Sequence, residues 1–351
     1  MTEDFRARLG AALADERPLD VQGFERPREF MERVSEDLGP LLDIANRPII
    51  SAHQFDREQV VQLCRVAARY ETQPQRINRP LTGKILISAF YEPSTRTRLS
   101  FESAWHRLGG DVMSITDPTS TGLAKGESLR DIGEMLNQYG DLVVLRDSDE
   151  RAVYEMLETL RIPIVNGGNG LDEHPTQALA DVYALLKWRP AIASGEPCEP
   201  VRIGVIGVPG RMRTVRSLLV LLSRFADVID RVVIVTDEEA PFSKGQREEL
   251  EQAGLRIDVS ADLDATLPSL DVVYINAIAW KGTSYESIGA RFRLTAESPF
   301  KPGAVVLHPL ARGEELDPSV DATPHNWYFA QARGAVFVRM ALLSALLKTY
   351  V

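Results

Sequence analysis

The sequence predicts an α/β fold with two doubly wound parallel-sheet domains, and three observations predict this class. The chain has 351 residues, which suits two domains of ordinary size. Short apolar runs of strand length alternate with segments of helical periodicity, both before residue 189 and after residue 200. Between the two series, residues 189–200 are rich in Pro, Gly and Ala, which is typical of a linker.

Residues 1–46 are predicted to form an N-terminal extension of short helices. Phe5, Leu9 and Leu13 recur at helical spacing, but three prolines interrupt the segment. We expect this extension to contribute to packing or assembly.

The first α/β series contains short runs rich in Ile, Val and Leu. They predict strands at residues 84–90, 111–115, 141–146 and 163–168. Helical periodicity predicts helices at residues 56–70, 94–108, 127–139 and 175–188. The polar residues 116–126 are predicted to form a loop. Because strands and helices alternate, we expect a parallel sheet covered by helices.

The second series repeats this alternation. It predicts strands at residues 201–207, 231–237, 255–260, 271–277 and 304–310. Helices are predicted at residues 213–225 and 243–253. A final helix over residues 334–349 is predicted from an apolar stripe of Val336, Met340, Leu343, Leu346 and Leu347.

Charge and composition exclude several classes of protein. The net charge of −10 should repel nucleic acid. Cys64 and Cys198 are too few for a disulfide framework or a CxxC metal site, so we expect them to fill the core. The N-terminus is charged, and no apolar run approaches ~18 residues, which predicts no secretory signal, no membrane span and a cytoplasmic location.

The densest polar cluster is Glu-Pro-Ser-Thr-Arg-Thr-Arg at residues 92–98, between a predicted strand and a predicted helix. A helix N-terminus presents unpaired backbone N–H groups and a partial positive charge. Hydroxyls and guanidiniums added at this point predict a phosphate pocket. The alternative is that Ser94 is simply an N-cap, with Thr97 and Arg98 as ordinary first-turn residues.

Three further clusters carry polar side chains at loops or strand ends. The glycine-containing loop at residues 119–127 carries Lys125, which either closes over an anion or is a solvated surface lysine. Arg146 ends an apolar strand, where it either contacts an anion or pairs with a neighbouring aspartate. His174 and Gln177 open a helix and either face one ligand together or make structural hydrogen bonds.

Taken together and in this order, these clusters resemble the aspartate/ornithine carbamoyltransferase family, and its aspartate branch most. The likeness runs from about Arg47 to the C-terminus and includes the STRTR, LSFESAWHRLGG, KGES, HPTQ, LHPLAR and TPHNWYFAQA motifs. It implies an active-site cleft between a carbamoyl-phosphate-binding domain (residues 47–188) and an acceptor-binding domain (residues 189–330). A C-terminal helix (residues 331–351) would pack back on the first domain.

The resemblance also implies the roles of individual residues. It assigns catalysis to Arg96, Thr97, Lys125, Arg146 and His174. It assigns carbamoyl-phosphate binding to these five residues and to Ser94, Thr95, Thr121, Gln177 and the backbone carbonyl near Leu310. Thr121 and Lys125 would come from a neighbouring subunit of a homotrimer. No metal, flavin or nucleotide cofactor is implied.

The acceptor side departs from the aspartate branch. Arg213 matches a family arginine that binds the acceptor's carboxylate. Ala277 and Ala279, however, stand where this branch carries an arginine and a glutamine, and Gly282 replaces a further arginine. Losing a charge-assisted contact costs roughly 1.5–3 kcal/mol.

These departures favour an acceptor amine with one carboxylate, bound by Arg213 and by the segment containing Ala277, with Trp280 or Lys281 at its far end. Ordinary aspartate carbamoylation is the alternative, in which Arg291 or Arg293 would replace the missing arginine. A third alternative is a non-catalytic homologue that binds carbamoyl phosphate.

Two other sequence features bear on the second domain. Ala311 replaces the second proline of the family's HPLPR motif, so we expect a cis X-Pro bond to be lost there. The run VRIGVIGVPGRMRTV is similar to a dinucleotide fingerprint, but its glycines are spaced G-x-x-G-x-x-G rather than G-x-G-x-x-G.

Overall fold

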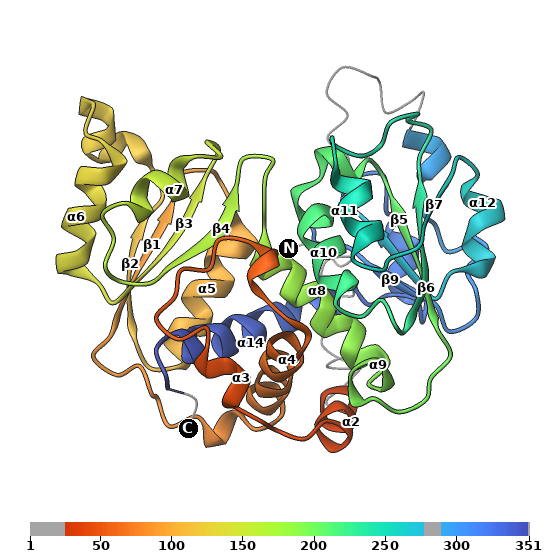
Figure 1. Ribbon diagram of the computed structural model, residues 1–351, viewed down its shortest axis with the longest axis horizontal. Helices are drawn as coiled ribbons and strands as arrows, with labels where there is room; N and C mark the ends of the chain where they lie inside the picture. The colour runs from red at the N-terminus through yellow and green to blue at the C-terminus, as the bar shows by residue number, and fades with distance from the viewer. Residues whose placement is uncertain (1–24, 277–288, 350–351) are drawn as a thin grey trace, which may run out of the picture.

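The computed structural model describes residues 25–276 and 289–349, and it contains two parallel sheets flanked by helices (Figure 1). The first sheet has the order β2 (Asp111–Ile115), β1 (Ile85–Phe90), β3 (Leu142–Asp147) and β4 (Ile164–Asn169). The second has the order β7 (Ile257–Ser260), β6 (Ile229–Val235), β5 (Val201–Ile206), β8 (Val272–Ile275) and β9 (Val305–Leu307). All strand pairs within these sheets are parallel, which confirms the predicted fold class.

Each sheet and its helices form one domain. The helices of the first domain are α4 (Arg57–Thr72), α5 (Thr95–Arg107), α6 (Leu129–Tyr139), α7 (Ala152–Leu157) and α8 (Pro175–Trp188). Those of the second are α10 (Arg213–Ser223), α11 (Gln246–Gln252) and α12 (Leu263–Thr266). Three further helices are α2 (Glu25–Arg33), α3 (Gly39–Leu42) and α9 (Ala191–Ser194).

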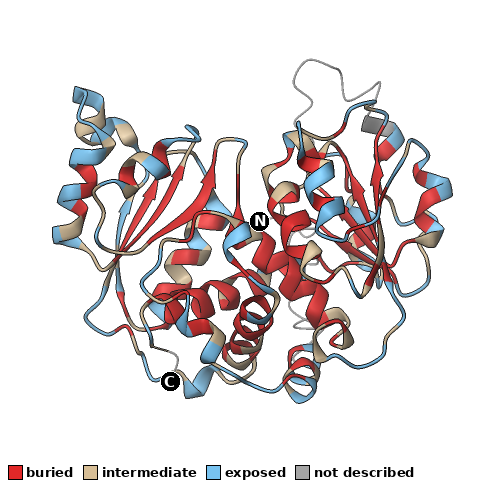
Figure 2. Ribbon diagram, in the orientation of Figure 1, coloured by how far each residue is buried: buried red, intermediate tan, exposed pale blue. Residues whose placement is uncertain are grey.

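Strand burial explains the apolar runs seen in the sequence. All six residues of β4 are buried, because helices cover both faces of the sheet (Figure 2). The edge strand β2 is instead largely exposed. Gly168, at the carboxyl end of β4, lies beside Arg213 at the start of α10 in the second domain.

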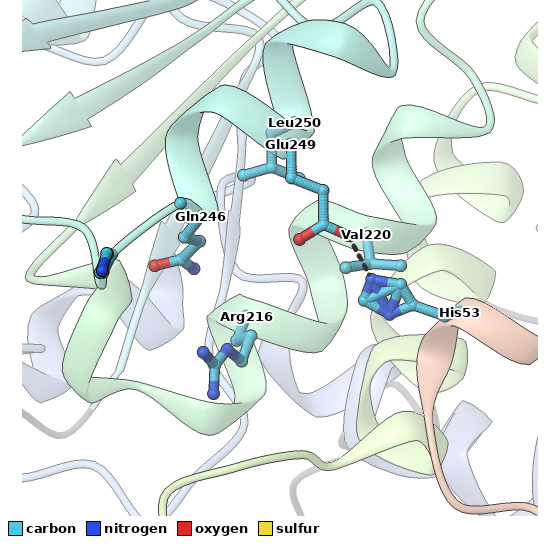
Figure 3. A pocket seen from close by; sticks show the side chains of 8 residues that line it. His53, Arg216, Val220, Gln246, Glu249 and Leu250 are labelled. Atoms are coloured by element: carbon cyan, nitrogen blue, oxygen red, sulfur yellow. Dashed lines mark hydrogen bonds and ion pairs between the residues drawn. The ribbon is translucent and has the colours of Figure 1, made fainter.

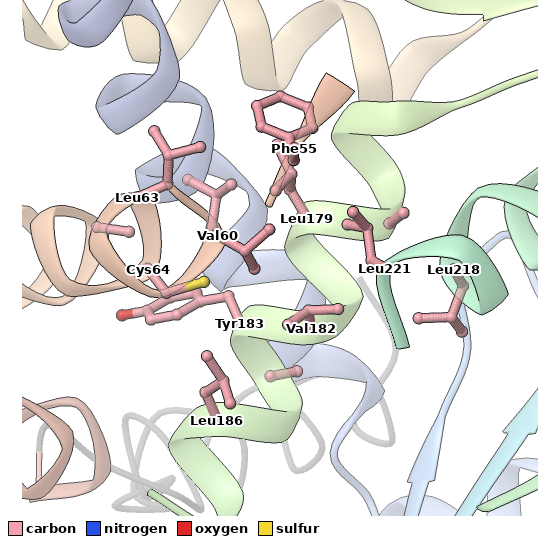
Figure 4. Packing of buried hydrophobic residues seen from close by; sticks show 14 of the residues in the cluster. Phe55, Val60, Leu63, Cys64, Leu179, Val182, Tyr183, Leu186, Leu218 and Leu221 are labelled. Carbon is pink, nitrogen blue, oxygen red and sulfur yellow. The ribbon is translucent and has the colours of Figure 1, made fainter. Parts of the chain in front are cut away.

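Helices α4, α8 and α10 pack together through apolar side chains at the domain boundary. Figure 4 shows Val60 and Leu63 of α4 beside Leu179 and Val182 of α8, with Leu221 of α10 on the other side of α8. All of these side chains are buried, as is Cys64, which fills the core as predicted.

The last helix, α14 (Tyr328–Leu346), lies against α4, α5 and α8 of the first domain, although it follows the second sheet in the chain. It is the one helix within residues 25–276 and 289–349 that is long and apolar enough to cross a membrane. Most of it, 78% of the most apolar stretch, is buried inside the protein, as expected of a core helix.

The predicted start of this helix, residue 334, was six residues too late. Gly334 lies inside the helix, where an added Cβ would come within 2.9 Å of Tyr183 Cδ1. The glycine therefore permits close helix packing and does not begin a helix. The sequence also did not predict α7, whose six residues are too few to show a period.

Candidate active site

Three predicted site residues converge beside Gly168, at the carboxyl end of β4. A Cβ added to Gly168 would lie 3.0 Å from Arg146 Nη1, 3.3 Å from His174 Cδ2 and 3.5 Å from Arg213 Cζ. Gly168 also has a φ of 113°, which L side chains rarely adopt. Arg146 ends β3, His174 precedes α8 and Arg213 opens α10, so both domains contribute to this point.

The predicted phosphate pocket is the start of α5. Ser94 occupies the N-cap position, as the alternative interpretation expected, but its side chain makes no capping hydrogen bond within the described residues. Thr95, Arg96 and Thr97 form the first turn, whose backbone N–H groups have no helical partners. Thr97 is buried and Arg96 is exposed.

The two arginines of this turn differ in their partners. Arg98 pairs with Glu102 at 3.2 Å. Arg96 makes no ion pair with any carboxylate in the described part of the chain, and its charge contributes to lowering the pKa of Arg146 and of His308. Arg96 is therefore the guanidinium of this turn that is available to a phosphate.

Arg146 is buried and points toward the domain boundary. Its Nη2 donates to Glu92 Oε1 at 2.7 Å and its Nη1 to the Gly167 carbonyl at 3.3 Å, whereas its Nε has no partner. The alternative, an ion pair with a neighbouring aspartate, is wrong because Glu92 takes that place. Burial, and then the charge of Arg213, lowers the pKa of Arg146.

Glu92 is a site residue that the sequence reasoning missed. Besides Arg146, its carboxylate accepts hydrogen bonds from Nη1 and Nη2 of Arg213, each at 3.0 Å. Burial acts to raise its pKa, but the hydrogen bonds and charges of Arg213 and Arg146 leave the pKa below its usual value. Its signal in the sequence was a single carboxylate at the start of an otherwise cationic cluster.

His174 is buried and neutral at pH 7. Burial lowers the pKa of its imidazole well below the usual value, and the charges of Arg146, Arg213 and Arg339 act in the same direction. Its Nδ1 has no hydrogen-bond partner among residues 25–276 and 289–349. Its backbone N–H donates to Ser217 Oγ of α10 at 2.9 Å, which ties the start of α8 to the second domain.

Two further predicted site residues, Gln177 and Leu310, belong to different domains. Gln177 Nε2 donates to Asp181 Oδ1 at 2.7 Å. The Leu310 N–H donates to His308 Nδ1 at 2.8 Å, and Leu310 has a φ of 56°.

The peptide bond between Leu310 and Ala311 is cis, so the expected loss of a cis bond at Ala311 was wrong. The loop is held by hydrogen bonds that need no proline ring. The Leu310 N–H donates to His308, and the Gly313 N–H donates to Glu315 Oε1 at 2.6 Å.

Thr121 and Lys125 are not brought to this site within one chain. They lie in the segment after the edge strand β2, on the side of the first sheet away from β4. Thr121 Oγ1 accepts from the Leu123 N–H and so caps a short 3₁₀ helix, Gly122–Lys125. Lys125 is exposed and pairs with none of the carboxylates in the described ranges.

On the acceptor side, Ala277 and Trp280 lie outside the described residues, as do Ala279, Lys281 and Gly282. The two arginines considered as substitutes pair elsewhere. Arg291 lies 3.6 Å from Asp237, and Arg293 forms an ion pair with Asp317. Of the three predicted acceptor contacts, Arg213, Ala277 and Trp280, Arg213 alone lies within the described residues.

A separate cavity of about 210 Å³ lies beside the same domain boundary (Figure 3). His53 and Glu249 line it from opposite domains, with 2.6 Å between His53 Nε2 and Glu249 Oε1. None of the predicted site residues lines this cavity. The contact between His53 and Glu249 is a second polar bridge across the domain boundary, beside the one that Glu92 makes with Arg213.

Two α/β domains that meet at a cluster of cations define an enzyme for an anionic substrate. A family model described as "Aspartate/ornithine carbamoyltransferase, carbamoyl-P binding domain" matches residues 47–187. A second, described as "Aspartate/ornithine carbamoyltransferase, Asp/Orn binding domain", matches residues 199–346. The chain therefore belongs to the aspartate/ornithine carbamoyltransferase family and is a carbamoyltransferase.

Individual relatives agree with this assignment. The aspartate carbamoyltransferase catalytic subunit of Methanopyrus kandleri is 38% identical over 311 residues, covering 86% of this chain and 98% of that protein. The catalytic subunit of Saccharophagus degradans is 37% identical over 313 residues, covering 85% and 92%. The aspartate transcarbamoylase of Trypanosoma cruzi, solved with carbamoyl phosphate and aspartate, matches with a TM-score of 0.81 and 32% identity, covering 88% and 98%. The family predicted from the motifs is confirmed.

Proposed function

We propose that this chain transfers the carbamoyl group of carbamoyl phosphate to the amino group of a carboxylate-bearing acceptor and releases phosphate. The observation that carries this proposal is the convergence of Arg146, His174 and Arg213 beside Gly168. The start of α5 supplies an anion site on the same side of the first sheet.

The phosphate group would bind at the first turn of α5. The N–H groups of residues 95–97, the hydroxyls of Ser94, Thr95 and Thr97, and the guanidinium of Arg96 are all donors, which suits a dianionic leaving group.

The chemical step places negative charge on the carbamoyl oxygen. The acceptor amine attacks the carbonyl carbon, the bond from this carbon to the phosphate oxygen breaks, and phosphate takes up the proton of the amine. Thr97, Arg146 and neutral His174 would donate hydrogen bonds to the oxyanion. Because burial keeps the pKa of His174 low, its imidazole acts as a hydrogen-bond donor without carrying a charge.

The carbamoyl NH2 needs acceptors rather than donors. Gln177 Oε1 is available for this role because Gln177 Nε2 already donates to Asp181. The backbone carbonyl of Leu310 would be the second acceptor, so one group from each domain would hold the NH2.

Arg213 would bind the carboxylate of the acceptor, exchanging part of its contact with Glu92. Aspartate is the first acceptor to test, because the relatives are aspartate carbamoyltransferases and one was solved with aspartate. An amine with one carboxylate is the second, because Ala277 and Ala279 replace the branch's arginine and glutamine. Trp280 would then contact its far end.

Lys125 and Thr121 would serve the site of a neighbouring copy, because their own chain holds them beyond the outer edge of the first sheet. This arrangement requires an oligomer, and we propose the homotrimer that the family resemblance implies. A cytoplasmic location stays a prediction from the sequence.

The test is a steady-state assay of phosphate release from carbamoyl phosphate with aspartate and a panel of amino acids, with the ureido product identified by mass spectrometry. Saturation by aspartate at low millimolar concentration would select the first acceptor. Turnover with another amino acid alone would select the second. Carbamoyl-phosphate binding in calorimetry, with no amine-dependent phosphate release, would contradict the enzymatic proposal.

A further inference from the structure

Asp181 is a fully buried carboxylate on α8, one turn after Gln177. It accepts three hydrogen bonds from three different elements. Gln177 Nε2 of α8 and Gln331 Nε2 of α14 donate to its Oδ1 at 2.7 and 2.6 Å, and the Tyr274 hydroxyl of β8 donates to its Oδ2 at 3.0 Å. Asp181 therefore connects the first domain, the second sheet and the last helix.

The carboxylate determines how the amide of Gln177 is oriented. An ionised carboxylate is only an acceptor, so Gln177 must present its NH2 group to Asp181. Its Oε1 is thereby directed away from Asp181. A glutamine without this partner can rotate its amide by half a turn and present a donor where an acceptor is needed.

The same carboxylate acts on the loop that carries Leu310. Because Gln331 Nε2 donates to Asp181, Gln331 Oε1 is left to accept the His308 N–H, at 2.8 Å. The His308 ring in turn accepts the Leu310 N–H through Nδ1 at 2.8 Å. His308 therefore carries its proton on Nε2, which lies 3.0 Å from Glu315 Oε1.

We propose that Asp181 is a positioning residue for recognition of the donor's NH2 group. It would orient Gln177 Oε1 directly and the Leu310 carbonyl through Gln331 and His308, so that two acceptors face that group. This inference rests on the proposed function, because that function assigns the NH2 contacts to Gln177 and Leu310.

Burial raises the pKa of Asp181 to about 6, although the hydrogen bonds from Gln331, Gln177 and Tyr274 act to lower it. The carboxyl is thus largely ionised at pH 7 and acts there as the acceptor that this role requires.

The experiment compares carbamoyl phosphate with acetyl phosphate, whose methyl group replaces the NH2 and cannot donate a hydrogen bond. For each variant, the ratio of the two kcat/KM values measures NH2 recognition and is insensitive to the fraction of folded enzyme. The full-length protein is assayed at pH 8, with thermal unfolding recorded in parallel.

Asp181→Ala is expected to lower this ratio at least tenfold, as Gln177→Leu does. Asp181→Asn should restore it to within about threefold of the original, because the asparagine oxygen still accepts from both glutamines. Tyr274→Phe is the matched control, since it removes one hydrogen bond to Asp181 but leaves the Gln177 contact, and it should keep the ratio.

A ratio unchanged in Asp181→Ala but lowered in Gln177→Leu would overturn the inference and leave the proposed role of Gln177 standing. Unchanged ratios in both variants would overturn that role as well. No turnover of carbamoyl phosphate by the original chain would overturn the proposed function and the inference together.

Discussion

Glu92 and Arg213 face each other across the domain boundary in a bidentate pair, with both oxygens of the carboxylate 3.0 Å from guanidinium nitrogens. Glu92 also holds Arg146, so one carboxylate orients two cations from two domains. Without it, Arg146 and Arg213 would repel each other, since the charge of Arg213 already contributes to lowering the pKa of Arg146.

We expect Glu92→Gln to lower kcat/KM for the acceptor at least tenfold and the free energy of unfolding by about 1–3 kcal/mol, because two cations lose their shared partner. The pKa of Glu92 is depressed, so its stabilisation is present above its unfolded pKa and is lost as the pH falls through the folded value. Urea unfolding at several pH values measures this, with Glu251→Gln, at an exposed partner of Arg247, as control. A stability difference that does not shrink as the pH falls below the unfolded pKa would contradict this account.

Gly168→Ala should abolish most of the activity. The new methyl group would lie 3.0 Å from Arg146 Nη1 in the space that the three site residues share, and the backbone conformation is unfavourable for alanine. Gly303→Ala is the matched control, because Gly303 also has a positive φ, of 80°, but no atom lies within 4 Å of its added Cβ. Equal turnover of the two variants would show that Gly168 does not border the reacting groups.

Arg96→Ala is predicted to reduce kcat/KM for carbamoyl phosphate by about 100- to 1,000-fold, because it removes a donor from a preorganised anion site. Arg98→Ala, in the same turn, should mainly affect stability, since Arg98 is paired with Glu102. Kinetics and thermal unfolding of both variants separate the effects. An Arg96→Ala enzyme with unchanged turnover would refute the assignment of the phosphate site.

A mixture of Lys125→Ala and Arg96→Ala chains tests whether sites are shared between copies. Each variant alone should be nearly inactive. After random subunit exchange, about one quarter of the sites of a trimer would combine an intact Arg96 with an intact Lys125 from the neighbour. Activity is measured before and after exchange, and light scattering gives the mass of the assembly. No gain on mixing would mean that Lys125 does not act in trans.

Asp181→Asn should stabilise the protein in alkaline solution. Burial raises the pKa of Asp181 to about 6, above its unfolded value, so the ionised carboxylate costs stability that grows as the pH rises through this range. We expect a gain of up to about 3 kcal/mol at pH 8 that disappears near pH 4. Urea unfolding at both pH values measures it, and Asp264→Asn, at an exposed aspartate, should show no such gain. A gain of the same size at both pH values would contradict this explanation.

The fold was predictable because burial leaves a direct pattern in the sequence. Buried strands such as β3 and β8 read as continuous apolar runs, and most element boundaries agree within a few residues. The start of α14 was missed because the apolar stripe that predicted this helix begins only at Val336, although the helix begins at Tyr328.

The motifs predicted Arg146, His174 and Arg213 as site residues, and the structure brings these three together beside Gly168, while their roles stay predictions. Glu92 was missed because its partner Arg213 is 121 residues away in the chain, so no local pattern joins them. The geometry of Leu310 was also mispredicted, since hydrogen bonds donated to His308 and Glu315, and not the residue after Leu310 alone, shape that loop.

The position of α14 has a consequence for synthesis of the protein. This helix completes the apolar interior around α4, α5 and α8, yet it is made after both sheets. During translation, the first domain leaves the ribosome before α14, so the apolar surface that α14 covers stays exposed until residues 328–346 have emerged. All strands of the second sheet have been made by then. A chain stalled shortly before residue 328 would therefore expose an apolar groove in its first domain, and chaperones would bind such a nascent chain.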